Sequence, residues 1–309
     1  MVNSFRTFVL FAALLAFGVQ GWAQGGLRVQ KVTQDIYALV GDLGNRSPEN
    51  LGNNATFGLV VTDEGAVLID SGGSYAGAQA IAVAIKTVTD QPVVKVINTG
   101  GQDHRWLGND YFKRQGAEII AGAAAVEDQQ ARTQDQLIVL NNLVGEELMA
   151  STNPVYAETR FEDEYAFTLG GKEFAIHHKG QAHTPGDSFV WLPGEKTLFS
   201  GDIVYVERML GVGGQSNSKS WLEAYQAMAA FEPRHLIPGH GPATTLARGN
   251  KDTRDYLRFL RRSIGAFIDN GGNVADISSV DQSSFSYLLN FDSLAGRNAQ
   301  QVFFEMEWE

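Results

Sequence analysis

Short apolar runs, several of them alternating with polar residues, fill the first half of the chain and are typical of strands joined by tight turns. Polar segments that contain glycine, such as Asp63-Glu64-Gly65, separate neighbouring runs. Ala-rich helical spacing at residues 76–88 predicts a helix between two of the strands. The expected strands cover residues 29–40, 57–61, 66–69, 93–97 and 118–121.

The second half repeats this order after a long helix-prone stretch. Gly170-Gly171 and Pro193-Gly194 each lie between two short apolar runs, so both predict hairpins. Ser220 is the expected N-cap of a later helix, whereas residues 302–308 alternate only weakly. The expected helices cover residues 123–148, 221–231 and 254–268, and the expected strands cover residues 165–169, 173–177, 188–192, 197–199 and 235–237. Strands alternating with helices predict one α/β domain with sheets inside and helices outside.

The composition restricts the chemistry. The 309 residues are 44% hydrophobic and 19% charged, which is enough apolar material for a large folded core. A net charge of −11 argues against a nucleic-acid partner, because such binding depends on Lys and Arg contacts to phosphates. The chain contains no cysteine, which excludes disulfides, a cysteine nucleophile and thiolate metal sites. Any metal ion would therefore be held by His, Asp or Glu.

The first residues have the pattern of a secretory signal peptide. Arg6 precedes an apolar stretch at residues 8–19, and the small residues Gly21 and Ala23 precede an expected cleavage site. We therefore expect residues 1–23 to be removed and residues 24–309 to form the mature domain in the periplasm or outside the cell. No later stretch is apolar enough for a transmembrane helix, so no stable membrane insertion is expected after cleavage.

Three polar loops that follow predicted strands each carry one histidine. These are His104, His183 and His240, and a fourth loop carries Asp202. Asp103 directly precedes His104. Loops at strand ends can bring polar groups together at one point on a rigid sheet. Three imidazoles and two carboxylates form a donor set suited to a divalent ion such as zinc or iron.

These loops resemble, in order and spacing, those of the metallo-β-lactamase-fold superfamily. The resemblance covers essentially the whole mature chain and implies an α/β fold, the αββα sandwich of that superfamily. Segments near the C-terminus also resemble exported members associated with quinoprotein relay or sulfur oxidation. The segments that carry the resemblance are Asp70-Ser71-Gly72, residues 98–109, His183-Thr184-Pro185-Gly186-Asp187, Gly201-Asp202, Pro238-Gly239-His240-Gly241, Arg297-Asn298 and Phe303-Phe304-Glu305.

One loop departs from the family pattern His-x-His-x-Asp-His. Aligning Asp103 and His104 with the end of that pattern puts Thr99 and Gly101 where the first two histidines belong. The resemblance then leaves the first metal site with only His183 and a share of Asp202, unless a neutral side chain contributes. The neutral candidates are Gln102, Asn98 and Thr99. The second metal site keeps Asp103, His104, Asp202 and His240, so the sequence predicts one Zn²⁺ rather than two, with iron as an alternative.

The resemblance implies an exported metal-dependent hydrolase of a small-molecule substrate. A metal-activated water would attack an ester, thioester, lactone or amide, with Asp103 and His183 as the candidate catalytic residues. His183 could act as a base, polarise the substrate or hold its loop. Two alternatives stay open, namely a mononuclear-iron oxidoreductase of the same fold and a non-catalytic descendant that binds a metal or ligand. The oligomeric state is not predicted.

Several neighbouring residues are expected to support the site. Asp70 should hold the loops through backbone hydrogen bonds, and Asp187 should tie its own loop. Arg105 and Trp106 are expected to line the mouth of the site, although Trp106 could equally belong to the core.

Overall fold

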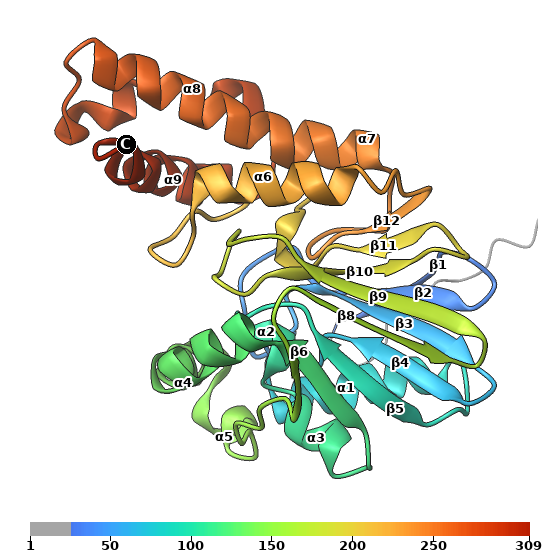
Figure 1. Cartoon of the computed structure of the whole chain (residues 1–309). Helices are drawn as coiled ribbons and strands as arrows, with labels where there is room; N and C mark the ends of the chain where they lie inside the picture. The colour runs from blue at the N-terminus through green and yellow to red at the C-terminus, as the bar shows by residue number, and fades with distance from the viewer. Residues whose placement is uncertain (1–25) are drawn as a thin grey trace, which may run out of the picture.

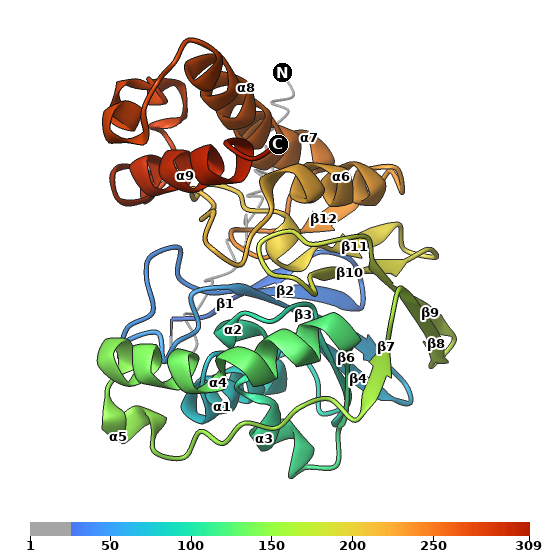
Figure 2. The same cartoon turned by 60° about the vertical axis from the view of Figure 1, so that its left-hand side comes forward.

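A computed structural model describes residues 26–309 of the chain. The expected signal peptide at residues 1–23 lies outside the described residues. Two sheets pack face to face, and helices cover both outer faces (Figures 1 and 2). The predicted αββα sandwich is therefore confirmed.

The first sheet contains seven strands in the order of the sequence. The strands from β1 to β4 pair antiparallel through hairpins, and the strands from β4 to β7 pair parallel through helical crossovers. Their bounds are Arg28–Lys31 (β1), Ile36–Val40 (β2), Thr56–Thr62 (β3), Gly65–Ile69 (β4), Val93–Asn98 (β5), Glu118–Gly122 (β6) and Thr159–Phe161 (β7).

The second sheet contains five strands in the order β12-β11-β10-β9-β8. The two predicted hairpins form β8–β9 and β10–β11, and β12 adds parallel to β11. The bounds are Glu164–Leu169 (β8), Lys172–His178 (β9), Ser188–Leu192 (β10), Thr197–Phe199 (β11) and His235–Ile237 (β12).

The helices form the two outer layers. The first layer contains α1, α3, α4 and α5, and the second contains α6, α7, α8 and α9, while the short α2 lies in the loop after β5 (Figure 1). Their bounds are Tyr75–Lys86 (α1), Asp103–Trp106 (α2), Asn109–Lys113 (α3), Ala123–Val144 (α4), Glu146–Met149 (α5), Ser218–Ala229 (α6), Leu246–Gly249 (α7), Asp255–Asp269 (α8) and Phe291–Met306 (α9).

Apolar side chains form three main clusters that correspond to the layer contacts. Val60 and Ile97 of the first sheet pack with Phe174 and Val190 of the second, and this cluster joins the two sheets. A second cluster joins α1 to the outer face of the first sheet. A third joins the second sheet to α6, α8 and α9 around Trp221. Burial on both sides fixes the sheets, and so fixes the loops that leave their strands.

Three local expectations differ from the structure. The N-cap of α6 is Asn217, whose side chain accepts from the backbone N–H of Ser220, so the helix starts earlier than expected. Residues 98–109 contain the helical turn α2 as well as loop. Helix α9 was not predicted, because its core-facing residues, such as Ala295, Asn298 and Ala299, are small or polar.

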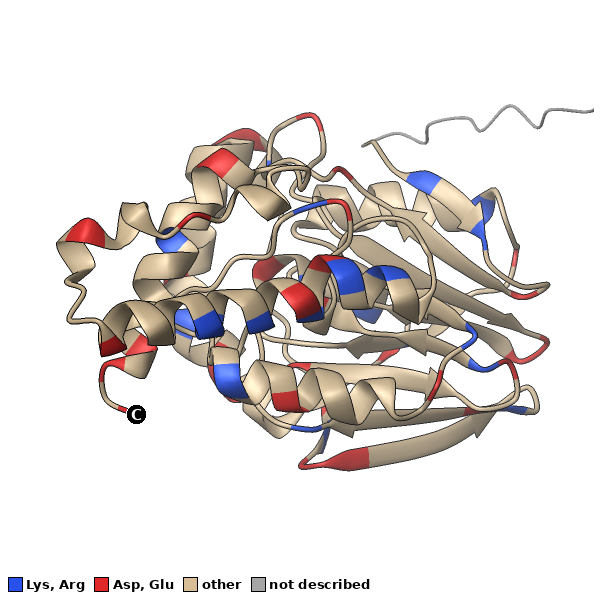
Figure 3. Cartoon of the chain, turned by 90° about the horizontal axis from the view of Figure 1, so that it is seen from above, with Lys and Arg blue, Asp and Glu red and all other residues tan. Residues whose placement is uncertain are grey.

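Charged residues of both signs occur along the described chain. In the view of Figure 3, basic and acidic residues are interspersed along the helices and loops. Within residues 26–309, no helix combines the length and hydrophobicity that crossing a bilayer requires.

Candidate active site

Four loops at one end of the two sheets carry the residues predicted for the site. His104 lies in α2, just after β5, and Asp202 lies in a 3₁₀ turn at Gly201–Ile203 after β11. His240 follows β12, and His183 lies in the loop between β9 and β10. β11 and β12 are parallel and end on the same edge of the second sheet, and the side chain that follows β5 of the first sheet meets theirs, so three of these side chains come together. His104, Asp202 and His240 present atoms that all lie within 4.8 Å of one another.

The His104–Asp202–His240 group is buried and tightly connected. The Nε2 atom of His104 lies 3.2 Å from Oδ2 of Asp202, and the Nε2 atom of His240 lies 3.1 Å from Oδ1. The two imidazoles meet edge to face, with their centroids 5.0 Å apart. The Tyr205 ring stacks on His240 at a centroid distance of 4.4 Å. This packing fixes both rings against the carboxylate.

Arg105 lies beneath this group and is fully buried, rather than at the mouth of the site where it was expected. Its Nη2 donates to Asp202 Oδ1 at 2.6 Å, and its Nη1 donates to Asp70 Oδ2 at 2.8 Å. A further bond of 2.9 Å runs from Nη2 to the carbonyl oxygen of Gly239, next to His240. Although burial would raise the pKa of Asp202, the Arg105 charge and then His104 hold it well below the ordinary value. Asp202 is therefore a carboxylate at neutral pH.

Asp103 is not part of the His104–Asp202–His240 group. Its Oδ1 accepts from Nε and Nη2 of Arg46 at 3.1 and 2.5 Å and also lies 3.2 Å from Nδ1 of His104. Burial would raise the pKa of Asp103, but the Arg46 charge holds it well below the usual range. Asp103 thus anchors Arg46, and its proposed metal ligation and catalytic role stay predictions.

His183 lies at the same cavity as the group but outside its contacts. Its Nδ1–H donates to the carbonyl oxygen of Gly211 at 2.9 Å, which leaves a lone pair on Nε2. Within residues 26–309, no hydrogen-bond partner occupies that Nε2 atom. Burial lowers the pKa of His183 to about 4, so the ring is neutral at pH 7. His183 is consequently an available proton acceptor, although a weak one.

The loop with the changed motif is held by hydrogen bonds to other protein groups. Thr99 donates to Asp70 from both its backbone and its hydroxyl group, and Asn98 bonds to the Arg105 carbonyl and to Asn109. Neither is therefore available to complete a first metal site, whereas Gln102 lines the cavity. The bonds to Thr99 confirm that Asp70 holds the loop.

Two glycines of the same loop have no room for a side chain. A Cβ at Gly100 would clash with the carboxylate of Asp187, and one at Gly101 would clash with that of Asp128 on α4. Gln129 Nε2 also donates to the Gly100 carbonyl at 3.0 Å. Helix α4 thus packs against the loop positions next to the changed motif.

Asp187 ties the His183 loop, as expected, by accepting from the backbone N–H and hydroxyl of Thr184.

Burial and then the Asp202 charge raise the pKa of Asp187 to about 8, against about 3.9 in an unfolded chain. Between these values the native state holds a proton that the unfolded state releases. Stability should therefore fall as pH rises from about 4 to about 8. Asp187→Asn should flatten that decline, and urea unfolding of both proteins at pH 5 and pH 8 measures it. An unchanged pH slope in the variant would contradict this assignment.

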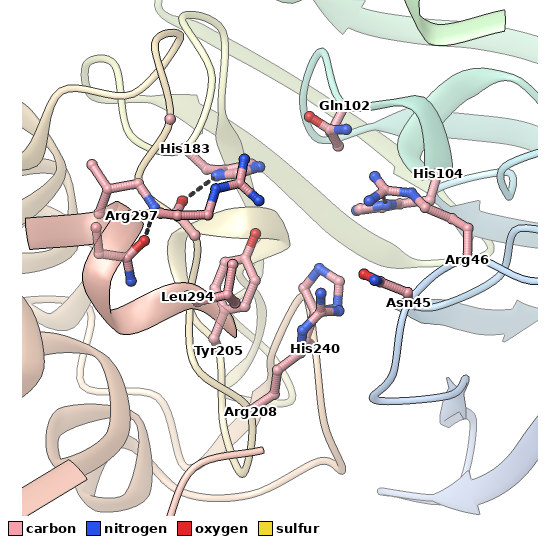
Figure 4. Close-up of a pocket in the computed structure, with 14 residues that line it drawn as sticks. Asn45, Arg46, Gln102, His104, His183, Tyr205, Arg208, His240, Leu294 and Arg297 are labelled. Carbon is pink, nitrogen blue, oxygen red and sulfur yellow. Dashed lines mark hydrogen bonds between the residues drawn. The ribbon is translucent and has the colours of Figure 1, made fainter. Parts of the chain in front are cut away.

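The cavity over the group has a volume of about 240 Å³ and is rich in arginine (Figure 4). Arg46, Arg208 and Arg297 line it, and no described lining residue is acidic. These arginines were not expected from the sequence, because they come from three distant segments without a shared motif. The described lining residues are Asn45, Arg46, Gln102, His104, His183, Tyr205, Arg208, Gly211, Val212, Gly213, His240, Leu294, Arg297 and Asn298.

Arg208 is a buried cation that lacks an anionic partner among residues 26–309. Its residue exposure is 7%, and its Nε atom is buried without a hydrogen-bond partner in that range. Its Nη1 lies 3.0 Å from Nδ1 of His240 and 3.4 Å from the Asn54 carbonyl oxygen. Burial lowers the pKa of Arg208, but a guanidinium group is not deprotonated in proteins, so the side chain stays charged. An unpaired buried charge is costly unless an anion joins it.

The donors fit poorly to the metal ion that the sequence predicts. A catalytic zinc needs about three protein ligands with free lone pairs. Both oxygens of Asp202 already accept hydrogen bonds from Arg105 and from the two imidazoles. The described residues thus provide only a partial His/Asp group.

Known proteins are similar to this chain in sequence. The family model of the metallo-beta-lactamase superfamily matches residues 52–240, more than half of the chain. A metallo-beta-lactamase type 2 from Elizabethkingia meningoseptica is 23% identical over 239 residues, which are 74% of this chain and 87% of that protein. Metallo-beta-lactamase IND-1 from Chryseobacterium indologenes is 24% identical over 59% of this chain and 69% of its own length.

Solved structures show the same architecture. A metallo-beta-lactamase from Pontibacter korlensis superposes with a TM-score of 0.60 at 22% identity, covering 75% of this chain and 99% of that one. A sec-alkyl sulfatase superposes with a TM-score of 0.70 at 15% identity, covering 91% of this chain and 50% of its own. At these identities the structures establish the fold alone. From the match of the family model, the chain belongs to the metallo-beta-lactamase superfamily, whose members are typically metal-dependent hydrolases.

Proposed function

We propose that this protein is a hydrolase of small organic anions and that the arginine-lined cavity is its active site. The observation that carries the proposal is Arg208, a buried cation without a carboxylate partner in the described chain, at a cavity lined by Arg46 and Arg297. A substrate carboxylate or a comparable anionic group would supply the missing charge, and hydrogen bonds between charged partners are the strong ones. The small cavity volume favours a low-molecular-weight substrate.

His183 is the proposed proton acceptor. Its Nε2 lone pair lies at the cavity and can take a proton from a water that attacks the carbonyl carbon of an ester, thioester, lactone or amide. Guanidinium N–H groups of Arg46 and Arg297 can stabilise the negative charge that develops on the carbonyl oxygen. Because His183 is a weak base, much of the rate enhancement would come from these arginines.

A matched pair of substrates tests this proposal. We expect the full chain to hydrolyse the nitrophenyl monoester of a dicarboxylic acid with a lower KM than nitrophenyl acetate. Arg208→Gln should raise the KM of the anionic ester about 10- to 100-fold, the usual effect of losing one charged hydrogen bond, and change that of the neutral ester little. Arg114→Gln is the matched control, since Arg114 is exposed and paired with Asp110 away from the cavity.

Two results would contradict the proposal. Equal KM values for the two esters would remove the anion specificity. Binding of the anion by calorimetry without any turnover above the uncatalysed rate would identify a non-catalytic descendant of the superfamily instead.

We also propose that the protein is exported, on the basis of the signal-peptide pattern at residues 1–23. Fractionation of expressing cells followed by N-terminal sequencing tests this. A mature N-terminus near residue 24 in the exported fraction would support the proposal, and retention of residue 1 in the cytoplasm would overturn it.

A further inference from the structure

We propose that the His104–Asp202–His240 group functions without a metal ion. Arg46 and Arg208 lie against the Nδ1 atoms of the two imidazoles, where a zinc site has hydrogen-bond acceptors. Arg105 occupies the oxygens of Asp202, which a zinc site needs to be free. The inference concerns the same site as the proposed hydrolysis, but its readout is metal binding. The metal-binding inference and the proposed hydrolysis can therefore be contradicted independently.

The imidazoles have the wrong polarity for zinc on Nε2. The Nδ1 atom of His104 lies 3.1 Å from Nη2 of Arg46, and Nδ1 of His240 lies 3.0 Å from Nη1 of Arg208. Arginine can only donate, so Nδ1 of His240 accepts from Arg208, and the ionised Asp202 carboxylate can only accept, so Nε2 of each ring carries a hydrogen. A zinc-bound histidine does the reverse, since its Nε2 binds the metal and its Nδ1–H donates to a carboxylate or carbonyl group.

The carboxylate of the group is also fully used. Oδ1 of Asp202 accepts from Arg105 at 2.6 Å and lies 3.1 Å from Nε2 of His240. Oδ2 accepts from Arg105 at 3.2 Å and lies 3.2 Å from Nε2 of His104. An ionised carboxylate has about four lone-pair positions, and four donors occupy them here. A metal ion could bind an oxygen of Asp202 only after one of these donors, an imidazole Nε2–H or Arg105, had left it.

Charge balance leads to the same conclusion. Arg46 pairs with the carboxylate of Asp103, and Arg105 pairs with those of Asp202 and Asp70, whereas Arg208 pairs with none among residues 26–309. The Asp103 Oδ1 atom near His104 Nδ1 is itself held by Arg46. The buried carboxylates are thus bound to arginine before any ion enters, and a divalent cation would add two positive charges beside the unpaired charge of Arg208. The arginines provide the positive charge that a metal ion would otherwise supply.

The inference can be tested by creating the metal site. In the double variant Arg46→Gln and Arg208→Gln, the amide oxygens can accept from Nδ1–H, which frees Nε2 for a metal. Changes to such outer partners alter metal affinity about 10- to 100-fold, so we expect at least a tenfold gain in affinity. The chelator-treated full chain, the double variant and the Arg114→Gln control are titrated with Co²⁺, read by visible absorption, and with Zn²⁺, read by equilibrium dialysis with elemental analysis.

The outcomes separate clearly. The wild type and the Arg114→Gln control should take up neither ion stoichiometrically at micromolar concentration, and the double variant should gain a one-to-one site. Uptake of one tightly bound zinc by the wild type would overturn the inference. Failure of a double variant with native circular dichroism to gain affinity would equally overturn the role given to the arginines.

Discussion

Replacing Arg105 with methionine is expected to lower the free energy of unfolding by about 3–5 kcal/mol, the usual cost of removing one partner from a buried ion pair. Arg105 is fully buried and bonds to the carboxylates of Asp70 and Asp202. Methionine has similar length and fills the space, so the loss reports on charge and hydrogen bonding rather than on a cavity. Urea unfolding followed by circular dichroism measures it.

Two further variants make this result specific. Arg105→Lys keeps the charge but cannot bond to both carboxylates in the same fork geometry, so its loss should be intermediate. Arg114→Met removes an ion pair whose arginine side chain is 60% exposed, and should cost less than about 1 kcal/mol. Equal losses in Arg105→Met and Arg114→Met would show that the buried arginine does not hold the site together.

The sequence was sufficient to predict the layers of the fold and the meeting of the loops. Two-residue turns such as Gly170-Gly171 mark hairpins by local chemistry, and apolar runs bounded by turns mark buried strands. The grouping of His104 with Asp202 and His240 follows from loops at strand ends, since the edges of the two packed sheets bring together residues far apart in the chain. Helix α9 gave a weaker signal, because its buried face is made partly of small and polar residues.

The partners of the charged residues could not be predicted in this way. Asp103 was expected beside the metal, but its partner Arg46 lies 57 positions earlier in the sequence and carries no motif. Arg105 was expected at the mouth, and its burial depends on Asp202, 97 positions later. Residue type and spacing identify polar groups that converge. They do not say whether a metal ion or an arginine neutralises them, because that depends on contacts across the whole domain.

His183→Ala is expected to lower kcat/KM for the anionic ester about 10²- to 10⁴-fold, the usual contribution of general-base catalysis. The pH profile provides a second readout. With the pKa of His183 at about 4, kcat/KM of the wild type for the neutral nitrophenyl acetate, which has no carboxyl group to titrate, should be flat near neutrality and fall as pH drops through 4 and the ring becomes protonated. The alanine variant should lose that acid limb. Steady-state kinetics between pH 3.5 and 8, with protein stability checked at each pH, tests both expectations.

A positioning role for His183 would give a different pattern. Asn can donate to the Gly211 carbonyl in place of Nδ1–H, but it has no nitrogen lone pair at the Nε2 position. His183→Asn should therefore be as inactive as His183→Ala if the imidazole accepts a proton. Substantial activity in the asparagine variant would show that His183 merely holds the loop at residues 211–213. His235→Ala at the far end of β12 is the control, and it should leave kcat/KM unchanged within about twofold, as expected of a substitution away from the site.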